Sequence, residues 1–313
     1  MTQYEKPSAF AVKHKDETVI VRSRSGGIFT ALSDGILENG GVVYGCILDE
    51  QFHVRHARAT DKDERNQMRG SKYVQSDMGQ CFKDCKKDLD LGKPVMFTGT
   101  ACQISGLKGF LGKDYENLLC VDIVCHGVPS PRVWADYLNW IQKGRQISSI
   151  DFRNKKKYGW ANHVMTIYFD NNEEVDDRTF IKLFGKCYIE RPSCFRCPYK
   201  NVSRPGDITI ADYWGVENAA PEFNDNKGTS LVLINNDKGQ RYFELVSREL
   251  RYKQTDLKDS MQPALTAPFP KPADREQFWR DYQNKGFDFI EKKYARDKLT
   301  DRVKGKIKRM LGQ

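Results

Sequence analysis

The chain up to Gly92 alternates short apolar runs with longer segments in which apolar positions recur at helical spacing. Runs rich in β-branched and aromatic residues predict strands, whereas a spacing of three and four residues predicts helices. Ser25 marks the start of one such helix, and Gly40 and Gly41 mark its end. The expected strands are 18–23, 42–49 and 53–59, and the expected helices are 25–40 and 78–92, with a polar loop at 69–76. We interpret this part as a first module, residues 1–92.

A second module begins with two repeats of an apolar strand followed by a helix, which is the order of an α/β layer. Beyond Gln146 the apolar runs are short and separated by polar turns, which indicates further strands. The expected strands are 93–99, 117–125, 149–155, 163–170, 178–184, 207–214 and 229–236, and the expected helices are 101–112, 129–144 and 238–250. The sequence therefore predicts an α/β protein with mixed sheets flanked by helices. Modules 1–92 and 93–265 are expected to pack closely, with a basic helical tail at 266–313.

The tail carries much of the positive charge of this 313-residue chain. Residues 286–313 contain nine Lys or Arg and four Asp or Glu, so they contribute +5 of the net charge of +9. Its apolar positions recur at helical spacing, at Leu299, Val303, Ile307 and Met310. We favour a helix docked on the body with a solvated basic face, and peripheral membrane contact is the alternative. Nucleic-acid binding is not expected, because the chain shows no nucleic-acid motif.

The composition indicates an intracellular globular protein. No apolar run approaches the roughly 18 residues that cross a bilayer, and the first residues lack the apolar core of a secretion signal. We therefore expect a cytoplasmic protein. Its nine cysteines are too sparse for a disulfide scaffold, so they are expected to stay as thiols that bind metals or pack in the core.

Four cysteines form a candidate metal site. Cys102 and Cys125 each follow an apolar strand, where α/β proteins bind ligands, and Cys194 and Cys197 form a Cys-x-x-Cys turn between two prolines. Four thiolates suit either zinc or a [4Fe-4S] cluster. Zinc ribbons usually bring two Cys-x-x-Cys pairs, whereas here one pair joins two single cysteines. The spacing therefore favours the cluster only slightly.

The other five cysteines are expected to be inert. Cys46, Cys120 and Cys187 lie in apolar or strand-like surroundings, where a free thiol packs as a small hydrophobe. Cys81 and Cys85 lie four residues apart on an expected helix, so metal binding or a redox pair is the alternative for them.

Seven segments, taken together and in this order, resemble the coenzyme F420 hydrogenase/dehydrogenase beta-subunit family. They extend from about Ser25 to Gly239 and read SGGIFTAL, RGSKYVQS, FTGTACQISGLKGF, DIVCHGVPS, RPSCFRCPYK, GDITIADYWGVE and KGTSLVLINNDKG. The resemblance implies one fold that holds FAD and a [4Fe-4S] cluster and moves electrons between iron-sulfur carriers and a small redox substrate. It favours a [4Fe-4S] cluster strongly over a zinc ion as the occupant of the four-cysteine site.

The resemblance also implies a role for particular residues. The cluster ligands would be Cys102, Cys125, Cys194 and Cys197. The flavin would contact four short motifs, namely Ser25, Gly26 and Gly27; Arg69, Gly70, Ser71, Lys72 and Tyr73; Gly99 and Thr100; and Gly127. Backbone amides at a helix start suit a pyrophosphate, and basic residues beside the flavin ring stabilise its reduced form. Without the resemblance, these motifs also fit a capped helix start and a solvated basic turn.

Three further features have both a functional and a structural interpretation. His126 is a candidate catalytic residue that hydrogen-bonds the flavin or relays a proton, and it equally fits a buried turn. Asp212, Tyr213 and Trp214 are expected to shape the wall of the site, with the aromatic rings packing rather than stacking on a ligand. The basic residues at 153–157 would attract an acidic electron carrier or simply mark a charged strand end.

The sequence departs from the family pattern in two places. Many members begin with a ferredoxin-like domain, whereas this chain has no cysteine before Cys46, so it resembles a short form that receives electrons from a separate ferredoxin or other acidic electron carrier. Ala101 stands where proline is common. We expect an oxidoreductase whose small-molecule substrate is open and includes deazaflavin. The alternatives are a non-catalytic electron-transfer subunit and a structural zinc protein.

Overall fold

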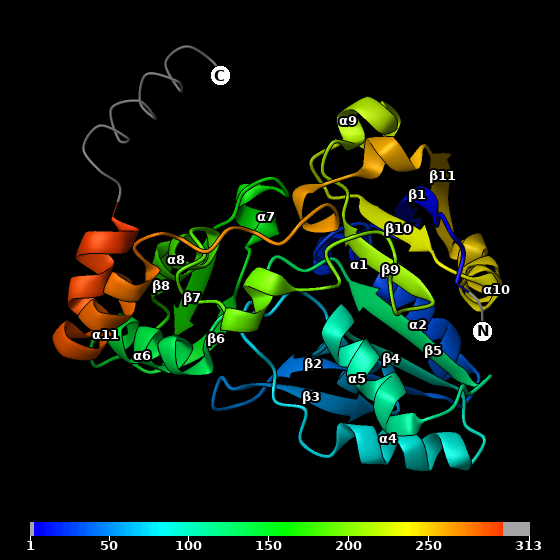
Figure 1. The fold of residues 1–313 in the computed structure, drawn as a ribbon, viewed down its shortest axis with the longest axis horizontal. Coiled ribbons are helices and arrows are strands. Elements are labelled where there is room, and N and C mark those ends of the chain that lie inside the picture. Colours follow the sequence, from blue (N-terminus) through cyan, green and yellow to red (C-terminus); the bar gives the residue numbers. More distant parts are fainter. Residues whose placement is uncertain (1–2, 297–313) are drawn as a thin grey trace.

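The computed structural model describes residues 3–296, which form a larger and a smaller lobe (Figure 1). A mixed eight-stranded sheet builds the larger lobe. Its strands, in spatial order, are β11 (Leu250–Thr255), β1 (Ser8–His14), β10 (Ser230–Ile234), β9 (Ile208–Asp212), β5 (Leu118–Ile123), β4 (Val95–Thr100), β2 (Val42–Leu48) and β3 (Val54–Ala59). The four strands from β9 to β2 run parallel, and every other neighbouring pair is antiparallel.

Helices cover both faces of this sheet, because each carries one apolar face. On one face lie α2 (Ile28–Glu38) and α10 (Asp237–Val246), whose buried side chains pack on β2, β4, β5 and β10. On the other face lie α4 (Cys81–Asp90) and α5 (Ala101–Leu111), which pack on β2, β4 and β5. Two short helices, α1 (Glu17–Arg22) and α3 (Lys62–Asn66), lie in connections, and α9 (Val216–Ala219) packs near β1 and β10. The sheet is therefore a buried layer between helices, as expected for parallel strands.

The smaller lobe contains a three-stranded antiparallel sheet, formed by β6 (Ile147–Asp151), β7 (Met165–Phe169) and β8 (Glu174–Asp177). Four helical segments accompany it: α6 (Pro131–Gln142), α7 (Lys155–Tyr158), α8 (Thr179–Gly185) and α11 (Arg275–Ile290), the last followed by a π-helical turn, Glu291–Ala295. Its core is rich in aromatic rings, including Trp134, Tyr137, Phe180 and Phe278. Five 3-10 turns complete the chain: Pro192–Arg196, Pro221–Phe223, Ser247–Glu249, Leu257–Ser260 and Pro263–Leu265.

The predicted fold class is confirmed, since the molecule is α/β with mixed sheets and flanking helices. Strand β1 comes from the start of the chain and pairs between β10 and β11, so the N-terminal and C-terminal parts share one sheet. This shared sheet explains why the two modules pack closely.

Two predicted strands are wrong. Residues 18–23 fall in helix α1, because the Asp16 side chain accepts a hydrogen bond from the Thr18 amide and starts a helix there. Residues 178–184 fall almost entirely in helix α8, whose buried positions Phe180, Leu183 and Phe184 follow helical spacing. Both segments are short and rich in β-branched or aromatic residues, so their composition predicted strands although they form helices.

The amphipathic pattern from Leu299 to Met310 lies outside the described residues, so it stays a prediction. Among the residues that the structure describes, no helix combines the length and the apolar character needed to cross a membrane.

Candidate functional site

The four predicted cluster cysteines lie around the carboxyl ends of neighbouring parallel strands. Cys102 is in the first turn of α5, directly after β4, and Cys125 comes two residues after β5. Cys194 lies within the 3-10 turn Pro192–Arg196, and Cys197 directly follows this turn. The carboxyl edge of parallel strands is the usual place for a ligand in an open α/β sheet.

The thiols of these cysteines act on one another electrostatically. Burial, with smaller contributions from negative charge on Cys194 and Cys102, raises the pKa of Cys125 to about 12. Burial also raises the pKa of Cys194, with added contributions from Cys102 and Cys197. Three distant segments therefore bring their four sulfurs into one neighbourhood. All nine cysteines are free thiols.

The spacing of these sulfurs differs from that of a zinc site. Around one Zn²⁺, with bonds of about 2.3 Å, neighbouring sulfurs lie about 3.8 Å apart. Among the described residues, one set of three or more His, Cys, Asp or Glu ligand atoms lies within 4.8 Å of one another, and it contains none of these four sulfurs. Within the described residues, no three of the four sulfurs are therefore as close together as one tetrahedral zinc ion would hold them.

Short contacts fix the loops that carry the cysteines. The Thr100 hydroxyl lies 3.1 Å from the Cys102 sulfur, and the Cys125 sulfur lies 3.5 Å from the Gly127 carbonyl oxygen. A Cβ at Gly127 would lie 2.7 Å from Glu190 Cγ and 3.7 Å from Cys194 Cβ. Glycine at this position therefore lets the loop after β5 approach the loop of Cys194.

Two residues that sequence reasoning missed support this site. Buried Lys200 donates a 2.6 Å hydrogen bond to the His126 carbonyl oxygen and supplies positive charge near Cys125, Cys194 and Cys197. Buried Arg204 pairs with buried Asp122 on β5 at 2.6 Å, which holds the chain after Cys197 against the strand that leads to Cys125. Basic residues behind a Cys-x-x-Cys turn were the available signal, but their partners lie far away in sequence.

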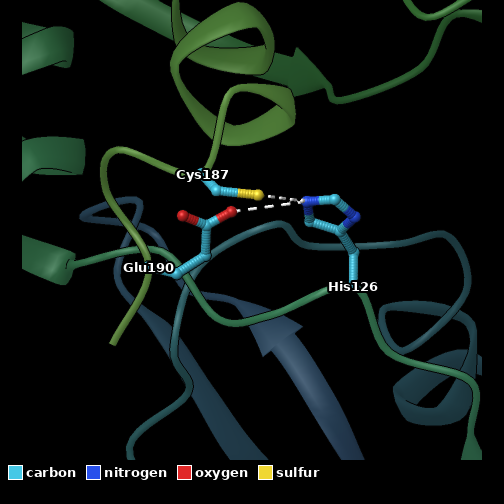
Figure 2. A group of neighbouring side chains, drawn as sticks. All are labelled: His126, Cys187 and Glu190. Carbon is cyan, nitrogen blue, oxygen red and sulfur yellow. Dashed lines mark hydrogen bonds and ion pairs between the residues drawn. The ribbon is translucent and has the colours of Figure 1, made fainter. Parts of the chain in front are cut away.

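His126 points its Nε2 atom toward Cys187 and Glu190 (Figure 2). Its ring packs against Phe269 and Phe184, with centroid distances of 4.0 and 4.8 Å. The catalytic role expected for His126 stays a prediction. Because Nε2 faces Cys187 and Glu190, a contact with a flavin would use Nδ1.

The Ser25 motif meets the end of β9 at a charged centre. The Ser25 hydroxyl donates to Asp212, and Arg24 and Arg153 form ion pairs with the same carboxylate at 3.5 and 2.8 Å. Burial alone would raise the pKa of Asp212, but the two arginines hold it below its ordinary value. We call these residues, with Trp160, whose indole N–H lies 3.3 Å from Asp212, the Asp212 centre.

Two arginine N–H groups around this centre are buried without a hydrogen-bond partner. They are Nη1 of Arg24 and Nε of Arg153, whereas Nε of Arg24 has the 3.5 Å ion-pair contact with Asp212. Buried donors are nearly always satisfied, so unpaired guanidinium groups indicate a missing acceptor. An anionic phosphate or pyrophosphate would fit this donor set. Sequence reasoning missed Arg24, although it directly precedes the predicted Ser25.

The glycines of the Ser25 motif have a packing role of their own. A Cβ at Gly26 would lie 2.1 Å from the Val12 carbonyl oxygen and 2.8 Å from the Ser230 amide, so α2 can approach β1 and β10 only with glycine there. Gly27 has φ of 94°, a left-handed conformation, at the N-cap of α2. These glycines thus serve the helix start as well as any ligand.

The Arg69–Tyr73 motif reaches the Asp212 centre through Tyr73, whose hydroxyl accepts a 3.3 Å hydrogen bond from Arg153. Lys72 donates instead to the carbonyl oxygens of Gln67 and Arg69, and burial lowers its pKa to about 8. Gly70 is exposed and Ser71 half-buried. Thus Tyr73 reaches the Asp212 centre, Lys72 mainly shapes its own loop, and Arg69 lies among the charges of Arg65, Asp34 and Arg22.

Gly99 and Thr100 connect β4 to the helix of Cys102. Gln103 accepts hydrogen bonds from the Thr100 amide and hydroxyl, which closes a capping box at the start of α5. A Cβ at Gly99 would lie 2.9 Å from Gln103 Oε1. The pair therefore sets the direction of the first turn of α5.

The basic residues at 153–157 are mostly used inside the molecule. Arg153 binds Asp212, Lys155 donates to the carbonyl oxygens of Ile20, Ser25 and Lys227, and Lys157 pairs with Glu174 and Asp176. The stretch is thus a structural connection between the lobes more than a free docking patch. Trp160 and Trp214 stack at 4.7 Å beside it, as expected for packing rings.

The sheet, its thiol-lined edge and the adjoining arginine centre define an α/β redox protein. Two family models agree: the N-terminal model of the coenzyme F420 hydrogenase/dehydrogenase beta subunit matches residues 9–83, and the C-terminal model matches residues 92–260. The chain therefore belongs to the coenzyme F420 hydrogenase/dehydrogenase beta-subunit family, which indicates an oxidoreductase with an electron-transfer role.

A solved structure supports the fold. A chain of the F420-reducing [NiFe] hydrogenase complex from Methanosarcina barkeri matches with a TM-score of 0.54 and 18% identity, covering 81% of this chain and 85% of that chain. Comparison with curated proteins found no significant match.

Proposed function

We propose that this protein is a cytoplasmic oxidoreductase that passes electrons between a ferredoxin-type carrier and a small redox substrate through a [4Fe-4S] cluster and FAD. Cys102, Cys125, Cys194 and Cys197 would hold the cluster. The observation that carries the proposal is the convergence of these four thiols, from three segments, in one electrostatic neighbourhood. Family membership supports the same assignment.

The flavin would lie between the cysteines and the Asp212 centre. Ser25, Gly26 and Gly27 would face its pyrophosphate, together with the unpaired N–H groups of Arg24, Arg69 and Arg153. The other expected contacts are Gly70, Ser71, Lys72, Tyr73, Gly99, Thr100 and Gly127.

When bound, the cofactors supply one-electron and two-electron chemistry, and the protein supplies position and charge. Lys200 would offset the negative charge of the thiolates, which a cluster site requires. Arg24 and Arg153 would neutralise the nucleotide phosphates. The carboxyl edge of β4 and β5 would fix the distance between the two cofactors.

A second candidate function is a non-catalytic electron-transfer subunit. The similar solved chain is part of a multi-subunit hydrogenase complex, which favours assembly with protein partners. Reduction of an acceptor such as deazaflavin by the isolated protein, with reduced ferredoxin as donor, would support the enzyme. Failure with every acceptor, together with activity on addition of a partner subunit, would support the subunit.

The first test is the metal itself. Anaerobically purified protein should be brown-yellow, with a broad cluster absorption over flavin peaks, whereas a structural zinc protein would be colourless. Replacing Cys194 by serine removes one ligand, so we expect iron to fall from four atoms per chain to well below one while some flavin stays bound. Iron analysis and absorption spectroscopy measure both.

Cys81→Ser is the matched control, because Cys81 is a buried free thiol on α4 that belongs to a separate core cluster. It should keep iron and colour. Unchanged iron in the Cys194→Ser protein would refute the ligand assignment.

A further inference from the structure

A second group of metal-ligand side chains lies beside the four cysteines. His126 Nε2 is 3.3 Å from the Cys187 sulfur and 3.4 Å from Glu190 Oε1, and the three ligand atoms all lie within 4.8 Å of one another (Figure 2). The histidine comes from the loop after β5, and the other two residues come from the chain between α8 and the turn of Cys194. This group is not among the predicted cluster ligands.

These distances match those of tetrahedral coordination. For bonds of about 2.0–2.1 Å to nitrogen, 2.3 Å to sulfur and 2.0–2.2 Å to oxygen, a tetrahedral angle separates nitrogen from sulfur by about 3.5 Å and nitrogen from oxygen by about 3.4 Å. The two distances from His126 Nε2 are therefore those that one shared ion would give.

The carboxylate of Glu190 lacks the partners that a buried charge requires. Glu190 is 2% exposed, and neither of its carboxylate oxygens has a hydrogen-bond partner. Two cations lie near Glu190, but both donate to backbone carbonyl oxygens, Lys200 to that of His126 at 2.6 Å and Arg275 to that of Glu190 itself at 2.7 Å. His126 is the one side chain that forms an ion pair with the Glu190 carboxylate within 4 Å among residues 3–296. Buried charges are normally paired or bound to metal, so this carboxylate points to a missing cation.

Cys187 also has an unusual backbone for its residue type. It follows α8 with φ of 60°, the left-handed conformation that glycine usually takes where a helix ends. A cysteine there is strained, and strain in a non-glycine residue is typical of positions kept for their side chain. The sequence predicted only packing for this thiol.

We propose that His126, Cys187 and Glu190 bind one divalent transition-metal ion of the zinc class, separate from the cluster of the proposed function. One thiolate, one carboxylate and one neutral imidazole neutralise a divalent charge, and this donor set suits Zn²⁺ or Fe²⁺. Three protein ligands leave the fourth position for water or another ligand.

The test uses Co²⁺ as a spectroscopic probe on the full chain. A Cys102→Ser/Cys194→Ser/Cys197→Ser background removes three of the four cluster ligands, so cobalt has only Cys125 left at that site. We expect one Co²⁺ per chain with a thiolate-to-cobalt absorption band in the near ultraviolet. Adding Cys187→Ser should abolish the band, and adding Glu190→Gln should raise the Kd for Co²⁺ by at least ~10-fold.

Cys81→Ser in the same background is the control and should leave both the band and the Kd unchanged. The proposal is overturned if the background binds no cobalt, or if the band survives Cys187→Ser. If the background variant does not fold, as judged by circular dichroism, the test is metal analysis of the reconstituted holoprotein that keeps all four cluster cysteines. One zinc per chain beyond the cluster iron, lost in Cys187→Ser, supports the site, and its absence refutes it. Both readouts are independent of iron in the cluster, so this proposal can fail while the proposed function stands.

Discussion

At the scale of single residues, Arg24 would report most directly on an anionic cofactor. Its Nη1 atom is buried without a hydrogen-bond partner, while Nε lies 3.5 Å from the Asp212 carboxylate and Nη2 donates to the Trp160 carbonyl oxygen at 2.7 Å. We expect Arg24→Gln to raise the Kd for FAD at least ~10-fold, because a hydrogen bond to a charged group contributes about 1.5–3 kcal/mol and 1.4 kcal/mol is tenfold. Titration of flavin-free protein, followed by flavin fluorescence, measures this.

Arg22→Gln is a close control for this variant. Arg22 ends α1 two residues earlier and is exposed, so its loss changes the net charge by the same amount without touching the Asp212 centre. Equal affinity of the two variants for FAD would place the nucleotide elsewhere.

The four cysteines and the flavin motifs could be proposed from the sequence because the chemistry of these positions is local in the sequence. A Cys-x-x-Cys turn between prolines and a Ser-Gly-Gly helix start can be read without knowing the fold. Lys200, Arg24 and Glu190 were not predictable in the same way, because each acts through residues distant in the chain. The carboxylate of Glu190, for example, is notable only once burial leaves it without partners.

At the scale of elements, periodicity predicted the long helices and the buried strands well, and it failed for short segments. Helices α1 and α8 are only one or two turns long, so local contacts determine whether they form. In α1 the N-cap Asp16 favours a helix more strongly than the β-branched residues favour a strand. Strands β1 and β11 were not predicted, since their pairing with each other and with β10 joins opposite ends of the chain. Long-range pairing leaves little trace in a local pattern.

Helix α4 is attached to the sheet by one buried carboxylate. Asp88 accepts hydrogen bonds from Tyr44 at 2.7 Å, Arg58 at 2.7 and 2.9 Å, and Lys93 at 3.0 Å. We expect Asp88→Asn to lower the free energy of unfolding at pH 7 by about 2–3 kcal/mol, because it removes a buried charge that three donors surround. Urea unfolding followed by circular dichroism measures the difference.

The same pair of proteins tests the pH dependence. Burial opposes ionisation of Asp88, but Arg58, Tyr44 and Lys93 hold its pKa well below the ordinary 3.8. Because the pKa of Asp88 is lower in the folded than in the unfolded state, ionised Asp88 stabilises the fold at any pH above its ordinary pKa. This contribution is lost as the pH falls through the folded-state pKa. The difference between wild type and Asp88→Asn should therefore be constant from pH 7 to about 5 and shrink below about 4. Asp84→Asn, in the exposed pair with Lys87, should show little effect at any pH.

At the scale of the whole molecule, the smaller lobe contacts the edge of the larger sheet at which the four cysteines lie. Tyr73 packs its ring on Phe184 and Phe152 of the smaller lobe while its hydroxyl meets Arg153, so the proposed flavin and cluster regions depend on both lobes. The sequence predicted that its modules pack together. It did not show that residues 131–200 and α11 form a lobe of their own, because α11 joins this lobe through aromatic contacts with distant residues such as Tyr137 and Tyr188.

The surface around the cysteine turn offers a place for an acidic carrier. Arg191 precedes Cys194, and Arg196 lies between Cys194 and Cys197. Both arginines are exposed and have no ion pair within 4 Å among residues 3–296. Charges at the rim of an interface act mainly on association and its salt dependence. We expect Arg191→Gln/Arg196→Gln to raise the KM for reduced ferredoxin several-fold, to leave kcat at saturating ferredoxin unchanged, and to weaken the dependence of KM on salt.

Lys83→Gln/Lys87→Gln is the matched control, because it removes the same charge from exposed positions on α4. At 0.1 M salt, exposed charges more than about 10 Å from the docking surface are largely screened. The control should therefore keep the wild-type KM at this salt concentration, as measured by steady-state kinetics with reduced ferredoxin. If both double variants raise KM equally, ferredoxin responds to net charge alone, and docking at the cysteine turn is refuted. If only the arginine variant does so, electrons enter the protein beside the proposed cluster.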